Sequence, residues 1–383
     1  MTVWLPAEGS TGLWLADLRL RDFRGYAQAD LAFAAGITVL IGANAQGKSN
    51  LLESVYTAAL GRSPRASADV ELVRFGQDRA YVRAEMREPR ADVLEVAVDR
   101  TTGEKRMKVN GVVVQRGQLL GRMAVVMAGP LDGDVIRGAP GARRRVLDAA
   151  LSQASPSYYF SLTRYLRVVR QRNRLLVEGA GGPALEPWDE QLVALGATLV
   201  ERRRGFVRVL AARAAERHAR IADGAEQLDI LYACTADDQD GAGGGPAGSG
   251  DADALARALA RSRGEELRRR TSLVGPHRDD LRITVNGIDL RTFGSRGQQH
   301  TAALSLRLGE AELLRDELGT WPILLLDDVL ADLDPSRQVL LLREIAGPQV
   351  LLTHTVAPPE AGMALETHVV RAGAVAAGTD VHA

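Results

Sequence analysis

The chain has 383 residues, with 48 basic and 48 acidic side chains and a hydrophobic fraction of 46%. This length and composition are typical of two or three folded units with a sizeable apolar core. The single cysteine, Cys234, excludes an intrachain disulfide framework and a cysteine-based zinc site. The sequence shows no signal peptide and no apolar run long enough to cross a bilayer, so we expect a cytoplasmic protein without a membrane partner.

Residues 1–12 are expected to be a flexible extension. Alternating apolar and polar residues predict a strand over 13–23 and the start of its partner over 30–33. The β-branched run 37–41 predicts a buried strand, and residues 48–60 predict a helix. Further strands are predicted at 81–85, at 93–98, and at 106–114 with a turn at Asn110-Gly111.

From residue 143 to residue 220 the apolar spacing becomes helical. The glycine-rich segment 237–253 predicts a flexible loop, and the tail 372–383 is featureless. The remaining predicted elements are a helix at 255–270 and strands at 281–285, 323–326 and 350–353. We therefore predict an α/β head built from residues 13–130 and 271–371, interrupted by a mostly helical insertion, residues 131–270.

The insertion is basic although the whole chain is neutral. Between Arg137 and Arg220 there are 16 arginines, no lysine and seven acidic residues, a local net charge of +9. Two interpretations are open: solvated helix faces with internal ion pairs, or a surface for phosphate backbones.

The segment Gly42-Ala-Asn-Ala-Gln-Gly-Lys48-Ser49 matches the phosphate-loop pattern G-x-x-x-x-G-K-[ST]. Its glycines let backbone N–H groups surround phosphate oxygens, and the dipole of the following helix favours an anion at the same place. Lys48 would neutralise the β- and γ-phosphates of ATP, and Ser49 would bind Mg²⁺. The simpler alternative is a glycine-rich turn. The predicted ATP-binding residues are Gly42, Ala43, Asn44, Ala45, Gln46, Gly47, Lys48 and Ser49.

Two adjacent carboxylates, Asp327 and Asp328, follow the apolar run 323–326. A buried strand would present both at its carboxyl end, where the sites of α/β proteins lie. Asp327 is predicted to bind Mg²⁺, and Asp328 to orient or deprotonate the water that attacks the γ-phosphate. Lys48 and Asp328 are thus the predicted catalytic residues. Without the phosphate loop, the same pattern would indicate only a strand end and a helix cap.

The segment Ser295-Arg-Gly-Gln-Gln299 precedes a predicted helix and forms an anion-binding cap. In ABC-type ATPases a signature loop at this position contacts the γ-phosphate held by the opposite subunit. Asp334 would belong to the D-loop, and His354, after a strand, would be the switch histidine. An ordinary helix cap and a structural histidine are the alternatives. The predicted contacts to the opposite subunit's ATP are Ser295, Gly297 and Gln298.

Together these motifs resemble the RecF family, a bacterial recombinational-repair group within the SMC-like ABC ATPases. The motifs Gly275-Pro-His-Arg-Asp-Asp280 and Trp188-Asp-Glu-Gln-Leu192 are the most specific. The resemblance extends from about residue 13 to residue 355 and also includes 18–26, 44–53, 60–63, 171–173 and 324–329. It implies an ABC-type ATPase head with an inserted lobe.

The resemblance also implies an ATP-dependent DNA-binding protein of recombinational repair, replication and the SOS response. ATP and Mg²⁺ would join two heads into a homodimer on double-stranded, gapped or junction DNA. Slow hydrolysis would reset it, so the chain would be a weak DNA-dependent ATPase used as a switch. The implied partners are RecO and RecR, which replace single-strand-binding protein by RecA.

Two arginine clusters have few acidic residues nearby in the sequence and are the predicted DNA contacts. They consist of Arg143, Arg144, Arg145, Arg202, Arg203 and Arg204. Other arginines are expected to pair with Glu178, Glu201 or Glu216 within the insertion.

Three positions depart from the family pattern: His300 stands where a basic residue is usual, Ala331 replaces a common serine, and residues 129–132 are altered. No site residue is therefore assigned at 129–132, and residues 275–280 are expected only to turn the chain back into the head. Two other functions stay open. The ATPase subunit of a membrane transporter would need a transmembrane partner, and a small-molecule kinase would leave the Ser295 loop without a purpose.

Overall fold

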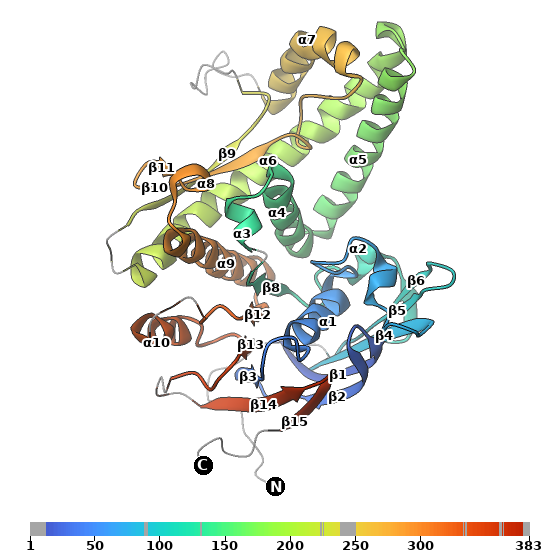
Figure 1. The fold of residues 1–383 in the computed structure, drawn as a ribbon. Coiled ribbons are helices and arrows are strands. Elements are labelled where there is room, and N and C mark those ends of the chain that lie inside the picture. The colour runs from blue at the N-terminus through green and yellow to red at the C-terminus, as the bar shows by residue number, and fades with distance from the viewer. Residues whose placement is uncertain are drawn as a thin grey trace.

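The computed structural model describes residues 13–87, 91–130, 132–222, 224, 226–237, 250–331, 333, 335–359, 362 and 364–377. Two parts lie one above the other: a head made from both ends of the chain and a lobe made mainly from its middle (Figure 1). The predicted extension 1–12 lies outside the described residues, as does most of the predicted loop 237–253.

One sheet of the head is antiparallel, in the order β2-β1-β4-β5-β6-β7. Its strands are β1 (Trp14–Phe23), β2 (Tyr26–Ala32), β4 (Arg79–Arg87), β5 (Val93–Asp99), β6 (Lys105–Val109) and β7 (Val112–Val114). Burial alternates along β4 and β5, as expected for strands with one face toward the core. The predicted turn between β6 and β7 is confirmed, since Asn110 and Gly111 have φ of 51° and 79°.

The second head sheet has the order β15-β14-β3-β13-β12-β8 and is parallel except for β15. Its strands are β3 (Ile37–Ile41), β8 (Val125–Ala128), β12 (Ile323–Asp327), β13 (Val350–His354), β14 (Leu365–Arg371) and β15 (Ala374–Ala377). Every residue of β12 and β13 is buried, which explains their continuous apolar runs. The register aligns the carboxyl ends of β3, β13 and β12, because His354 lies beside Ile41 and Thr353 beside Asp327.

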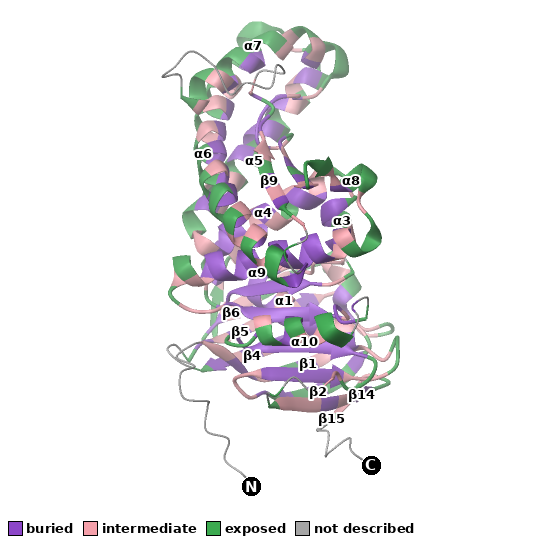
Figure 2. Ribbon diagram, turned by 90° about the vertical axis from the view of Figure 1, so that its left-hand side faces the viewer, coloured by how far each residue is buried: buried purple, intermediate pink, exposed green. Residues whose placement is uncertain are grey.

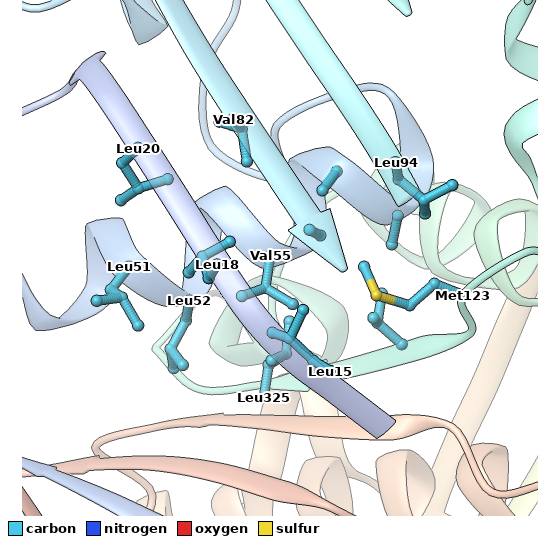
Figure 3. Packing of buried hydrophobic residues seen from close by; sticks show 14 of the residues in the cluster. Leu15, Leu18, Leu20, Leu51, Leu52, Val55, Val82, Leu94, Met123 and Leu325 are labelled. Carbon is cyan, nitrogen blue, oxygen red and sulfur yellow. The ribbon is translucent and has the colours of Figure 1, made fainter. Parts of the chain in front are cut away.

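Helix α1 (Lys48–Leu60) lies between the two sheets and joins their cores. Figure 3 shows Leu51, Leu52 and Val55 of α1 near Leu18 of β1 and Leu325 of β12. All five side chains are fully buried. This packing holds the beginning of α1, and therefore the phosphate loop before it, against the carboxyl edge of the parallel sheet. The smaller head elements are the 3₁₀ helix η1 (Asp69–Leu72), α2 (Arg116–Leu119) and α10 (Pro335–Glu344).

The lobe is a helical layer on a small antiparallel sheet of order β11-β10-β9. Its elements are α3 (Asp132–Ile136), α4 (Pro140–Ala154), α5 (Pro156–Val177), α6 (Gly182–Ile221), β9 (Leu228–Ala233), α7 (Asp251–Arg269), β10 (Asp280–Val285), β11 (Ile288–Asp289) and α8 (Leu290–Phe293). Figure 2 shows buried residues along the inner side of α6 and exposed residues on its outer side. The long helix α9 (Arg296–Leu318) packs against α6 and also against β8, so it connects the lobe to the head.

Three predictions about the chain's organisation are corrected. The predicted return to the head at residue 271 is too early, because β10 pairs with β9 of the lobe from Asp280 to Val285. Helix α7 begins at Asp251 rather than at residue 255. Part of the tail is structured, since β15 pairs with β14. Strands β8, β9 and β14 were not predicted.

Candidate nucleotide site and signature helix

The phosphate loop connects β3 to α1 and surrounds the ammonium group of Lys48. The Nζ atom donates to the carbonyl oxygens of Gly42 (2.5 Å) and Ala43 (2.9 Å). Backbone N–H groups of residues 43–47 donate to none of the described residues, so they are available to phosphate oxygens. Lys48 is buried although the loop before it is exposed from Ala43 to Ala45. The loop thus combines a fixed positive charge with unpaired backbone donors.

The C-terminal hairpin of β14 and β15 supports this loop. This contact was not predicted from the sequence. Gln46 accepts from the backbone N–H of Ala372 through Oε1 (2.7 Å) and from that of Gly373 through its carbonyl (3.1 Å). A Cβ atom on Gly42 would lie 2.3 Å from the carbonyl oxygen of Val370, so only glycine allows this approach. The contact is invisible in the sequence because more than 320 residues separate the two segments.

The carboxylate of Asp327 lies next to the hydroxyl group of Ser49. Ser49 Oγ donates to Asp327 Oδ1 at 2.8 Å, and Thr353 Oγ1 donates to the same oxygen at 2.8 Å. The structure therefore brings together the two residues predicted to bind Mg²⁺. A hydroxyl oxygen and a carboxylate oxygen are suitable ligands for this ion beside phosphates. Among the described residues, no group of three or more histidine, cysteine, aspartate or glutamate side chains could hold a metal.

Asp328 leaves the strand in a left-handed conformation, with φ of 55°. Its backbone N–H donates to Thr353 Oγ1 (2.9 Å), and its carboxylate lies 3.3 Å from Nδ1 of the buried His354. The Asp328 side chain keeps about two-fifths of its surface, 38%, exposed. The structure thus places the predicted switch histidine against the predicted catalytic acid. Thr353, which bonds the Asp327 carboxylate and the Asp328 backbone, was missed even though the end of its strand was predicted.

A buried carboxylate, Glu53, lies on α1 one turn after Ser49. Arg24 donates to both of its oxygens (3.0 and 2.8 Å), and Arg65 and Ser63 also donate to it. Burial would raise the pKa of Glu53, but these hydrogen bonds and the two arginine charges lower it below its usual value. Arg65 also donates to the backbone carbonyl of Ser49 (2.8 Å), so the cluster positions the loop.

The predicted signature loop caps α9 in the way its sequence indicates. Ser295 Oγ accepts from the backbone N–H of Gln298 (3.2 Å), and Gln298 Oε1 accepts from that of Ser295 (3.0 Å). Ser295 and Gly297 are exposed and Gln298 is half-buried. His300 approaches the carbonyl oxygen of Val329 through Nε2 (3.2 Å) and so contacts the segment after Asp328. The exposed cap has the accessibility that a contact with a second subunit requires.

The remaining site predictions have different outcomes. Asp334 lies outside the described residues. In the unassigned segment 129–132, Asp132 accepts from Gly129 N–H (2.9 Å) and from the half-buried Arg307 (2.8 Å), which closes the turn before α3.

The prediction that Arg143 and Arg203 contact DNA is wrong, because both side chains are buried. Arg143 forms an ion pair with Asp280 (2.6 Å), and Arg203 forms one with Asp148 (2.7 Å). Their acids were overlooked because Asp280 lies 137 residues away in the sequence and Asp148 lies 55.

The other four candidates are only partly available. Arg144 donates to the carbonyl oxygen of Asp279 (2.6 Å), and Arg204 pairs with Asp237 (2.6 Å) and Asp251 (3.3 Å). Arg145 and Arg202 are exposed and stay predictions.

Known proteins resemble this chain in sequence and in fold. The family model described as RecF/RecN/SMC N terminal domain matches residues 14–349. A protein of Symbiobacterium thermophilum called DNA replication and repair protein RecF is 41% identical over 347 residues, 90% of this chain and 92% of the relative. The chain belongs to the RecF family.

Other RecF relatives agree. The protein of the same name from Alkaliphilus oremlandii is 36% identical over 343 residues, 89% of this chain and 93% of the relative. A solved structure described as the recombination mediator protein RecF-ATP in the RecFOR pathway is 32% identical. It covers 97% of this chain and 99% of its own, with a TM-score of 0.87.

More distant structures share only the fold. An Smc head bound to the C-winged helix domain of ScpA is 15% identical, covers 94% of this chain and 96% of its own, and has a TM-score of 0.55. The predicted ABC-type ATPase head, built from both chain ends with a helical insertion, is therefore confirmed.

Proposed function

We propose that this chain is an ATP-dependent DNA-binding protein of recombinational repair and replication. The observation that carries the proposal is the meeting of the phosphate loop, Asp327 and Asp328 at one sheet edge, in a chain of the RecF family. The loop would hold the phosphates of ATP through its backbone N–H groups and Lys48. Action on chromosomal DNA would place the protein in the cytoplasm.

Mg²⁺ would be held by Ser49 and Asp327, which already face each other, and would neutralise charge on the β- and γ-phosphates. Asp328, with His354 beside it, would orient the water for an in-line attack on the γ-phosphate. We expect slow hydrolysis, because ATP would serve this chain as a switch rather than as a substrate for metabolic turnover. The chain would thus act as a weak DNA-dependent ATPase.

The exposed residues Ser295 and Gly297 at the beginning of α9 support ATP-dependent homodimerisation. A capped helix beginning that faces solvent offers N–H donors and the positive end of its dipole to an anion. In the proposed dimer, Ser295, Gly297 and Gln298 contact the γ-phosphate bound by the other head. RecO and RecR are the proposed partners, in keeping with the RecFOR pathway named for the related structures.

The transporter alternative has no support here. The curated relatives are called DNA replication and repair proteins. Among the described residues, no helix has both the length and the apolar character needed to cross a bilayer.

The variant Asp328→Asn tests the proposal because it keeps the shape of the side chain but removes the charge that orients the water. We expect ATP-induced dimers and DNA complexes to persist in this variant while ATP turnover falls by about 100-fold. Light scattering measures the dimer, and phosphate release measures turnover. Turnover at the wild-type rate, or a wild-type protein that neither dimerises nor binds DNA with ATP, would refute the proposed function.

A further inference from the structure

The outer face of α5 is a row of arginines that the nucleotide site does not use. Arg164, Arg167, Arg170 and Arg174 are exposed and recur at helical spacing. The fifth arginine of the helix, Arg172, points inward and is fully buried. We call the four exposed residues the α5 arginine row.

Inward and outward arginines on this helix differ in how their charges are balanced. Arg172 pairs with Asp189 (2.7 Å) and Glu266 (2.6 Å) inside the lobe. In the α5 arginine row, only Arg174 pairs with an acid, the exposed Glu178 (2.9 Å). Arg164, Arg167 and Arg170 form no ion pair or hydrogen bond with any described residue. The lobe therefore neutralises the arginine that it buries and leaves a strip of positive charge on its outside.

The base of α5 continues this charge onto the head. Figure 1 shows the N-terminal end of α5 next to α2, and the Arg116 guanidinium of α2 lies 5.4 Å from the centre of the Tyr159 ring. Burial lowers the pKa of Arg116, and the nearby charge of Arg62 lowers it further. Asp69, the acid that opposes this effect, already pairs with Lys105 (2.7 Å). Arg116 also donates to the carbonyl oxygen of Leu60 (2.7 Å), so one further guanidinium is held at the foot of the row.

We propose that the α5 arginine row, continued at its base by Arg116, binds the phosphate backbone of double-stranded DNA. The proposal rests on the proposed function and names the surface that carries it. The ten helical steps from Arg164 to Arg174 rise about 15 Å. A DNA duplex carries one phosphate per about 1.7 Å of its axis, so several phosphates fall within reach of four arginines.

Arginine is suited to this task because its planar guanidinium can donate two hydrogen bonds to one phosphate. Phosphate oxygens are alike in every DNA sequence, and the exposed neighbours of the row include the apolar Phe160, Leu166 and Val177, which cannot hydrogen-bond to base edges. Binding through the row should therefore depend strongly on salt and little on DNA sequence.

The first test compares two triple variants that remove equal charge from the lobe. Arg164→Gln with Arg167→Gln and Arg170→Gln removes three members of the row. The control, Arg208→Gln with Arg257→Gln and Arg282→Gln, removes three exposed arginines of α6, α7 and β10. DNA affinity is measured with ATP from about 50 to 200 mM salt, and ATP binding and thermal unfolding confirm that both variants are folded.

We expect the row variant to lose about tenfold or more in DNA affinity and to lower the salt slope by about 0.9 for each lost contact. The control should keep the wild-type slope. Equal slopes in the row variant and the wild type would overturn the α5 proposal but not the proposed function, since DNA would then bind elsewhere. Wild-type protein that binds no DNA with ATP would overturn both.

The second test locates DNA without relying on affinity. Cys234, the single cysteine, is buried, so Gln171→Cys within the row introduces one accessible thiol for a photo-crosslinker. Ala212→Cys on the exposed part of α6 is the matched control. We expect ATP-dependent crosslinks to a random-sequence duplex from position 171 and at least about fivefold fewer from position 212. Equal yields at both positions, or crosslinks only at 212, would contradict the proposal.

Discussion

The nucleotide site of the head and the buried polar cluster around Asp279 in the lobe both contain aspartate, threonine and histidine side chains. The two sites differ in their hydrogen bonding. In the head, the phosphate loop leaves backbone donors unpaired, and Asp328 remains partly exposed. In the lobe, Asp279 is buried and accepts from Thr235 N and Oγ1 (both 2.7 Å) and from the Tyr232 hydroxyl. The head site can therefore bind a ligand, whereas the Asp279 carboxylate of the lobe already accepts its hydrogen bonds from the protein itself.

The lobe cluster explains the Gly275–Asp280 segment. The carbonyl oxygen of Pro276 accepts from Arg203 (2.6 Å), and Nδ1 of His277 lies 2.7 Å from the Tyr165 hydroxyl. Gly275 has φ of 120°, and a Cβ there would lie 2.4 Å from that hydroxyl oxygen. The segment therefore connects α5, α6 and β10, and this is a structural role that the sequence motif did not reveal.

The second specific motif, residues 188–192, also makes structural contacts. Asp189, from the segment 188–192, pairs with Arg172, from the segment 171–173. Asn173 accepts from both the backbone N–H and the hydroxyl group of Ser272 (2.7 Å each). A specific motif can therefore mark a stabilising contact as readily as a catalytic one. Four experiments test this distinction.

The largest effect on stability is expected from Arg203→Ala. Burial would lower the pKa of Arg203, but the charge of Asp148 raises it well above its usual value, so the pair is ionised. Removing the arginine leaves that carboxylate with the Tyr158 hydroxyl but without its charged partner, and we expect a loss of about 3–5 kcal/mol in the free energy of unfolding. Urea denaturation measures it, with the exposed Arg202→Ala as control. A loss below about 1 kcal/mol would show that the cluster is not a structural centre.

The opposite result is expected for Lys48→Ala. Losing two charge-assisted hydrogen bonds to phosphate should lower ATP affinity by roughly 100-fold, or about 3 kcal/mol, and should prevent ATP-dependent dimers. The free energy of unfolding should change by less than about 1 kcal/mol, since the lysine bonds only to loop carbonyls. Calorimetry with ATP measures the first quantity, and Lys108→Ala is the control. Destabilisation as large as that of Arg203→Ala would remove the contrast between the two regions.

A smaller, more selective effect is expected for Ser295→Arg. The long charged side chain should block approach of a second head while a monomer still binds ATP with wild-type affinity. Loss of the cap should cost about 1 kcal/mol of stability. Ser295→Asn, which keeps a capping side chain of modest size, is the matched control. Light scattering with ATP distinguishes them, and ATP binding lost in the monomer would place Ser295 in the same head's nucleotide site.

The pH dependence of stability should report on His277 in the lobe cluster. Burial lowers the pKa of His277 to about 4, below its usual value near 6.5, so the unfolded chain takes up a proton first as pH falls. Stability contributed by neutral His277 is therefore lost as pH falls from about 6.5 toward 4. The loss at pH 5.5 should be about 1.4 kcal/mol. Thermal unfolding at pH 7.5 and 5.5 should show a smaller decrease for His277→Asn, and an equal decrease would refute the assignment.

Much of the head could be predicted from the sequence because its signals are local. Strand β3 and helix α1 have the predicted bounds, since an apolar β-branched run and a glycine-rich turn act over a few residues. The cap at Ser295 is equally local, because Ser295 and Gln298 bond within one turn. The positions of Asp327 and Asp328 follow from the end of a buried strand.

Tertiary structure alone decided which charges are free. An arginine looks the same in the sequence whether its acid is one turn away, as for Arg174 and Glu178, or 137 residues away, as for Arg143 and Asp280. Long-range packing also set the register that places Thr353 beside Asp327, and it paired β10 with β9 instead of the head. Helix periodicity determines which side of α5 faces outward. Only the folded lobe determines that Arg172 is neutralised while Arg164, Arg167 and Arg170 meet no acid among the described residues, because ion pairing depends on distance in space.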